Sequence, residues 1–148
     1  MPTCSEARSS LLALLRGAEH FNTEVFPAKE ALFAGLATGQ SPSALFIACA
    51  DSRIDPSLIT QTDPGNLFIL RNIGNLVPAY GEMMGGVSAA VEYAVMALEV
   101  STIIVCGHSD CGAMNALLDP QDSGLDTMPT VKSWLRNAEA ARAATLST

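Results

Sequence analysis

Two short clusters of reactive side chains stand far apart in the sequence. Residues 49–53 read Cys-Ala-Asp-Ser-Arg, and residues 107–112 read Gly-His-Ser-Asp-Cys-Gly. Thiolates and imidazole are preferred ligands of zinc, and a catalytic zinc site uses three protein ligands and keeps a fourth position for water. The spacing His-x-x-Cys lets both side chains reach one ion across a turn that enters a helix. If the fold brings the clusters together, Cys49, His108 and Cys111 form such a trio.

Simpler interpretations compete with each part of this pattern. A cysteine after a strand is usually buried packing, Asp51 could cap the next helix, and Arg53 could form a surface ion pair. Cys49 could also be a nucleophile with His108 as its base, which would make the protein a thiol enzyme. That enzyme would need a reactive thiolate free of metal.

The remaining cysteines bear on whether a zinc site would be structural or catalytic. A structural site normally closes with a fourth Cys or His. Cys4 lies in residues 1–10, which we expect to be a flexible tail, and Cys106 lies in a predicted strand, where we expect it to point into the core. The lack of a fourth soft ligand in the sequence pattern favours catalysis.

Three apolar runs predict the strands that position these clusters. They cover residues 44–48, 67–70 and 102–106, and their apolar residues do not alternate with polar ones. Such runs are typical of strands buried on both faces of a parallel sheet. Both reactive clusters follow the carboxyl end of a predicted strand, which is where open parallel sheets bind their ligands.

Helical patterns separate and flank these strands. The fold class is therefore α/β, with an open, mainly parallel sheet flanked by helices and an N-terminal helical arm. The first helix has its apolar face on its own domain or, alternatively, on a partner subunit. The helical stretches are marked by Leu11, Leu14, Leu15 and Ala18, by a segment from Pro27 to Gly39, by residues 87–100 and 112–118, and by Val131, Trp134, Leu135 and Ala138.

Composition narrows the class of protein. The chain has 148 residues, which predicts a single domain over residues 1–148. A net charge of −7, with only eight scattered Lys and Arg, argues against nucleic-acid binding. Apolar runs are too short for a membrane span, and four irregularly spaced cysteines do not make a disulfide scaffold. We therefore expect a cytoplasmic protein without a membrane or nucleic-acid partner.

Residues 48–53, 71–75 and 106–113 read ACADSR, RNIGN and CGHSDCGA. Together these three segments resemble the β-carbonic anhydrases, especially the plant and cyanobacterial type. The resemblance implies Zn²⁺ held by Cys49, His108 and Cys111. It also implies reversible hydration of carbon dioxide to bicarbonate and a proton by zinc-bound hydroxide, which an Asp51–Arg53 dyad orients. The expected activity is thus that of a lyase, carbonate dehydratase.

The resemblance also implies a substrate pocket and an assembly. The family's active site lies at a dimer interface, so a homodimer or higher homo-oligomer is expected. Without the family, Phe68 and Tyr93 could equally be core residues. The pocket positions of the family fall on Gln40, Phe68, Ile73, Tyr93 and Gly112.

The chain departs from the family pattern in length. Family domains continue with at least two more strands, so the domain is expected to be incomplete, with the C-terminal strands of the family absent and one edge of its sheet uncovered. An inactive zinc-binding remnant or a non-catalytic assembly subunit therefore stands as the alternative to an active anhydrase.

Overall fold

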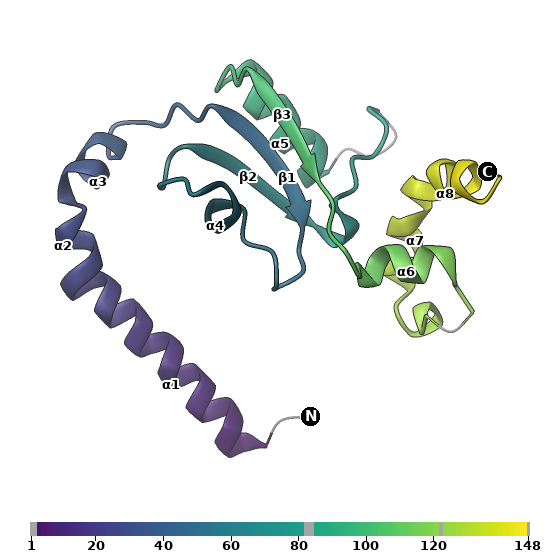
Figure 1. The fold of residues 1–148 in the computed structure, drawn as a ribbon, viewed down its shortest axis with the longest axis horizontal. Helices are drawn as coiled ribbons and strands as arrows, with labels where there is room; N and C mark the ends of the chain where they lie inside the picture. Colours follow the sequence, from purple (N-terminus) through teal and green to yellow (C-terminus); the bar gives the residue numbers. More distant parts are fainter. Residues whose placement is uncertain (1–2, 82–84, 122, 148) are drawn as a thin grey trace. The chain divides into compact units, whose positions relative to one another are not determined.

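The computed structural model describes residues 3–81, 85–121 and 123–147 of the chain (Figure 1). Contacts within the chain divide it into two compact units, Met1–Gln40 and Ser41–Thr148. The length predicted a single domain over residues 1–148, whereas these contacts set the N-terminal helical arm apart as a unit of its own. The arm contains α1 (Cys4–His20), a π-helical turn (Phe21–Val25), α2 (Phe26–Ala28) and α3 (Glu30–Leu36).

The first helix begins earlier than the sequence pattern indicated. The Thr3 hydroxyl accepts a hydrogen bond from the Glu6 backbone N–H at 3.3 Å, and the Glu6 carboxylate accepts one from the Thr3 backbone N–H at 2.7 Å. This reciprocal pair is a capping box, which satisfies N–H groups that the first turn would otherwise leave open. The flexible tail expected over residues 1–10 is therefore corrected, because α1 already begins at Cys4.

The arm buries little of its own apolar surface. No residue of α1 is buried, and Leu14 on the predicted apolar face is 72% exposed. Phe26 and Phe33 stack with their ring centroids 4.9 Å apart, and Phe21 lies edge-on to Phe33. These rings hold the turn between the helices, while the leucine face of α1 has no cover among the described residues.

The second unit contains a three-stranded parallel sheet. Its strands are β1 (Ala44–Cys49), β2 (Leu67–Asn72) and β3 (Thr102–Cys106), in the order β2-β1-β3 (Figure 1). Helix α4 (Pro56–Thr60) connects β1 to β2, and α5 (Gly86–Met96) connects β2 to β3. Since Ala48 pairs with both Arg71 and Cys106, the carboxyl ends of all three strands lie together.

Two apolar clusters hold this unit together. One packs Leu45 and Ile47 of β1 against Ala94 of α5. The other joins the C-terminal helices through Leu117, Leu125, Leu135 and Ala138. These elements are α6 (Gly112–Leu118), the 3₁₀ turn Leu125–Thr127, α7 (Pro129–Leu135), the 3₁₀ turn Arg136–Ala138 and α8 (Glu139–Leu146).

The strands differ in burial, contrary to the expectation that all three are buried on both faces. Every residue of β1 is buried, whereas Ile103 and Val105 of β3 are 46% and 55% exposed. In the described part of the chain, β3 pairs with β1 alone and forms one edge of the sheet. Cys106 is half-buried, so its expected place in the core is also corrected. An apolar run becomes buried only where other elements cover it.

No helix in the described part of the chain combines the length and the apolar character that crossing a membrane requires.

Candidate metal centre

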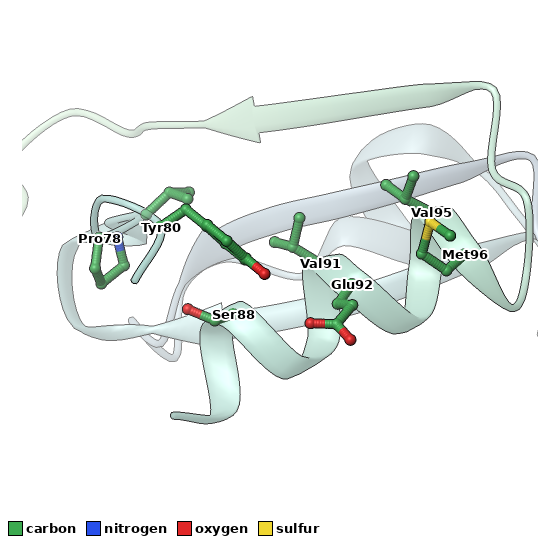
Figure 2. A pocket seen from close by; sticks show the side chains of 8 residues that line it. Pro78, Tyr80, Ser88, Val91, Glu92, Val95 and Met96 are labelled. Carbon is green, nitrogen blue, oxygen red and sulfur yellow. The ribbon is translucent and has the colours of Figure 1, made fainter. Parts of the chain in front are cut away.

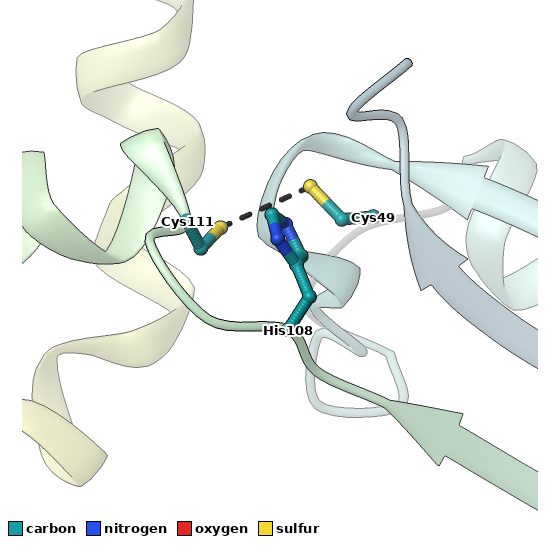
Figure 3. Close-up of side chains that lie close together, drawn as sticks. All are labelled: Cys49, His108 and Cys111. Carbon is teal, nitrogen blue, oxygen red and sulfur yellow. Dashed lines mark hydrogen bonds between the residues drawn. The ribbon is translucent and has the colours of Figure 1, made fainter. Parts of the chain in front are cut away.

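The metal-ligating side chains predicted from the sequence meet at the carboxyl ends of β1 and β3. Cys49 is the last residue of β1, His108 follows β3, and Cys111 is the N-cap of α6. Their candidate ligand atoms all lie within 4.8 Å of one another, and the Cys49 and Cys111 Sγ atoms are 3.9 Å apart. Figure 3 shows the three side chains pointing toward one another. The expected convergence of the two clusters is confirmed.

The hydrogen bonding of His108 leaves one of its ring nitrogens available to a metal. Its Nδ1 lies 2.9 Å from the Ser109 carbonyl oxygen, so Nδ1 carries the proton and donates it. The opposite nitrogen, Nε2, is buried and has no hydrogen-bond partner among the described residues. Metal-bound histidines commonly donate their second N–H to a carbonyl in this way, and a buried polar atom without a partner needs an explanation.

The donor set fits zinc. Two sulfur atoms and one imidazole nitrogen match the soft ligands that Zn²⁺ prefers. Both cysteines are buried, at 5% and 3% exposure. Among the residues that the structure describes, the cluster consists of these three groups. A zinc ion held here would therefore keep a position for a small ligand, as catalytic sites do.

Cys49 is prepared for metal binding by its surroundings. Burial raises the pKa of its thiol, but the nearby Asp51 backbone N–H, His108 side chain and Gly74 backbone N–H stabilise the thiolate more strongly and lower the pKa to about 7. The lowered pKa favours the thiolate, which is the form that binds metals.

Asp51 and Arg53 form a close ion pair beside the cluster. Arg53 Nε donates to Asp51 Oδ1 at 2.9 Å, and Arg53 Nη2 donates to Oδ2 at 2.8 Å. The Arg53 side-chain hydrogen bonds, followed by its backbone N–H, hold the pKa of the Asp51 carboxyl well below its usual range. The His108 Nε2 atom is 3.9 Å from Asp51 Oδ2. An ionised carboxylate is thus fixed next to the candidate ligands.

The residues proposed for the substrate pocket are more scattered. Phe68 and Tyr93 have ring centroids 5.9 Å apart, but Phe68 packs against the sheet core while Tyr93 is half-exposed. Ile73 lies in the turn after β2, and Gly112 directly follows Cys111 as the first residue of α6. Gln40 ends the other unit, Met1–Gln40, so it is not among the residues that Ser41–Thr148 brings together.

A groove elsewhere on this unit does not contain the metal ligands. It encloses about 480 Å³ between α5 and residues 77–80, and its walls are largely apolar (Figure 2). Tyr80, Val91 and Met96 are among the residues that line it, and Glu92 contributes a carboxylate. Because none of the three candidate ligands lines the groove, the metal centre and the groove are separate features.

The sequence pattern gave no role to Arg71, which is the first residue of the segment 71–75. In the structure Arg71 Nε donates to the Cys49 carbonyl at 3.1 Å, and Arg71 Nη2 donates to the Asp51 carbonyl at 2.6 Å. Arg53 also reaches beyond its partner, since its Nη2 donates to the Asp110 carbonyl at 3.0 Å. The spacing of residues along the chain carries no signal for such side-chain to backbone contacts.

Comparison with known proteins supports the same interpretation. A family model described as carbonic anhydrase matches residues 44–148. A carbonic anhydrase of Pseudomonas aeruginosa is 55% identical over 130 residues, which are 88% of this chain and 58% of that protein. One of Synechococcus elongatus is 50% identical over 129 residues, which are 87% of this chain and 47% of that protein. The chain thus spans about half the length of these curated relatives.

Solved structures agree with the sequence relatives. The β-carbonic anhydrase CcaA has a TM-score of 0.90 and 47% sequence identity, and the match covers 95% of this chain and 62% of that one. One of two tetrameric β-carbonic anhydrases from Sordaria macrospora has a TM-score of 0.77 and 31% identity, covering 94% of this chain and 67% of that chain. On the family match, the sequence identity and the fold, this chain belongs to the β-carbonic anhydrase family.

Proposed function

We propose that this protein catalyses the reversible hydration of carbon dioxide to bicarbonate and a proton, at a zinc ion held by Cys49, His108 and Cys111. The convergence of these three ligand atoms within 4.8 Å carries the proposal. Bound zinc would act as a Lewis acid, which lowers the pKa of bound water to about 7. Carbon dioxide is a weak electrophile, so the reaction needs such an activated nucleophile at neutral pH.

Asp51 is proposed to orient the attacking water. Its carboxylate is ionised, lies beside His108 Nε2, and can accept a hydrogen bond from the nucleophile. Arg53 fixes that carboxylate with two side-chain hydrogen bonds, a task suited to the planar fork of a guanidinium. Since Arg53 occupies both carboxylate oxygens, Asp51 is held where it can act on the water while the zinc ligands stay those three side chains.

The substrate pocket is proposed from the family resemblance. Phe68 and Ile73 would form an apolar wall for carbon dioxide, and the backbone N–H of Gly112 would face the substrate. Gln40 and Tyr93 would complete the pocket, with Gln40, Phe68 and Tyr93 serving the zinc of a neighbouring subunit.

A homo-oligomer is proposed on two observations. The leucine face of α1 has no cover in the described chain, and related structures include tetrameric β-carbonic anhydrases. Light scattering coupled to gel filtration would measure the mass, and a monomer at micromolar concentration would contradict this part of the proposal. We also propose a cytoplasmic location, because a reducing compartment keeps cysteines such as those described here as free thiols.

The decisive experiment measures stopped-flow carbon dioxide hydration and bound zinc on the same purified sample. We expect about one zinc per chain and hydration that follows the zinc content. Asp51→Asn is the matched variant, because it keeps the shape of the side chain but removes the charge that Arg53 holds. It should keep zinc and lose most of the hydration activity.

The competing functions give different results in the same experiment. Zinc without hydration would favour a zinc-binding remnant or a non-catalytic assembly subunit. No zinc, together with a Cys49 thiol that alkylates equally fast with and without added zinc, would favour a thiol enzyme. The contact between Cys49 and His108 is the observation that keeps this last alternative open.

A further inference from the structure

Arg71 binds the main chain on both sides of Ala50. One guanidinium donates to the carbonyl oxygens of Cys49 and Asp51, at 3.1 and 2.6 Å. Neither acceptor is a carboxylate, so these contacts are not a surface ion pair. Residues 49 and 51 are the candidate zinc ligand of β1 and the carboxylate proposed to orient water.

The position of these carbonyls explains why a side chain is needed there. Pairing between β1 and β2 ends with Cys49 opposite Asn72, and the last backbone hydrogen bond runs from the Ala50 N–H to the Asn72 carbonyl at 2.8 Å. Beyond this point the chain leaves the sheet and turns, with the Ile54 N–H donating to the Asp51 carbonyl at 3.0 Å. The sheet itself therefore fixes Cys49 but not the turn that carries Asp51.

A guanidinium is suited to bridging the end of the strand and the turn. It is planar and presents N–H groups in a fixed fork, so it can hold two acceptors at a set separation. Lysine has a single rotatable ammonium on a flexible stem and cannot reproduce that geometry. Arg71 itself is anchored by the register of the sheet, in which it lies opposite Ala48.

We propose that Arg71 is a positioning residue of the metal centre, which sets the placement of Cys49 and Asp51 relative to each other through their carbonyl groups. This inference rests on the proposed function, because it assigns the segment 71–75 a task at that site. It predicts that Arg71 controls metal affinity and metal geometry without contacting metal or substrate.

The test compares Arg71→Met with Arg71→Lys and with Arg136→Met, which removes an exposed arginine of the 3₁₀ turn Arg136–Ala138. We expect Arg71→Met to weaken zinc binding by about 10–100-fold in a chelator competition, as substitutions behind metal ligands commonly do. The visible spectrum of the Co²⁺-loaded protein should also change. Arg71→Lys should recover only part of both effects, and Arg136→Met should match the wild type.

A readout on the metal-free chain separates this inference from the proposed function. The amide protons of Arg53 and Ile54 donate to the Asp51 carboxylate and carbonyl, so their hydrogen exchange reports on the turn. Exchange of both should be about tenfold faster in Arg71→Met than in the wild type. If the wild-type chain binds no zinc but exchange is still faster in Arg71→Met than in the wild type, the proposed function is refuted and the positioning role of Arg71 stands.

The inference is overturned by a variant that loses only stability. If Arg71→Met unfolds at a lower temperature but keeps the wild-type zinc affinity, Co²⁺ spectrum and exchange rates, Arg71 is merely structural. If Arg71→Met does not fold, Arg71→Lys decides between the same outcomes: wild-type values in all three measurements would overturn the inference, and intermediate values would support it.

Discussion

Replacing Gly74 with alanine should destabilise the protein more than a typical glycine substitution. Gly74 is buried in the turn Ile73–Asn75 after β2, with φ +75° and ψ 19°. A Cβ atom at this position would lie 2.8 Å from Met114 Cε and 3.2 Å from Ala113 Cβ. The substitution therefore combines an unfavourable backbone conformation with a steric conflict against α6.

The two contributions can be estimated separately. A left-handed conformation costs a residue with a Cβ atom about 1–2 kcal/mol. Met114 Cε is the end of a flexible side chain and can move, at about 0.5–1.5 kcal/mol for a strained rotamer. Ala113 Cβ cannot rotate away, so α6 must shift by a few tenths of an ångström. We expect Gly74→Ala to lower the free energy of unfolding by about 2–4 kcal/mol in total.

Two other glycines provide matched controls. Gly124 has nearly the same backbone conformation, φ +68° and ψ 11°, but nothing lies within 4 Å of its added Cβ. Gly124→Ala should therefore cost about 1–2 kcal/mol, the strain alone. Gly35 lies in α3 with open space around it and no positive φ, so Gly35→Ala should be neutral or stabilising by up to about 1 kcal/mol.

The assay is urea unfolding of the metal-free protein at constant pH, followed by circular dichroism. The difference between Gly74→Ala and Gly124→Ala isolates the steric conflict with α6. Equal losses in these two variants would refute the packing argument, and no loss in either would refute the strain argument. Zinc affinity should also fall in Gly74→Ala alone, because the Gly74 backbone N–H hydrogen-bonds Cys49.

Three further predictions concern the metal centre and its support. Cys111→Ser should abolish zinc binding and hydration together, measured by metal analysis and stopped-flow kinetics; retained stoichiometric zinc would remove Cys111 from the ligand set. Arg53→Lys should keep zinc but lower kcat/KM for hydration by about 10–100-fold, because lysine cannot hold both oxygens of Asp51; unchanged kinetics would contradict the role of this ion pair. Trp134→Phe removes the 2.7 Å hydrogen bond from Nε1 to the Ile73 carbonyl and should lower the free energy of unfolding by about 1 kcal/mol, measured by urea titration. An unchanged free energy of unfolding would show that this bond does not stabilise the fold.

The convergence of the candidate metal ligands could be predicted from the sequence, because each ligand closely follows an apolar run that marks a strand. Cys49 directly follows a buried apolar run, and His108 and Cys111 follow another, so a parallel sheet with neighbouring strands brings them together. The start of α1 could also be predicted, since Thr3 and Glu6 have the spacing of a capping box. The expectation of a flexible tail over residues 1–10 overlooked this signal.

Other features depend on contacts that no local pattern encodes. The apolar residues of β3 suggested burial, but burial depends on which elements cover a strand, and Val105 is more than half exposed. The role inferred for Arg71 depends on the direction of its side chain from β2, and the fit of Gly74 depends on its closeness to Met114 and Ala113. Each joins segments that are distant along the chain.

The origin of the candidate ligands on two separate strands has a consequence for how the protein acquires its metal. His108 and Cys111 are neighbours in sequence and could hold an ion weakly in an unfolded chain, whereas Cys49 joins them only after β1 has paired with β3. A zinc ion bound by all three is thus a reversible cross-link between strands, and at a thousand times its dissociation constant it would add about 4 kcal/mol to the native state. Bound zinc would therefore report that β1 and β3 have paired correctly.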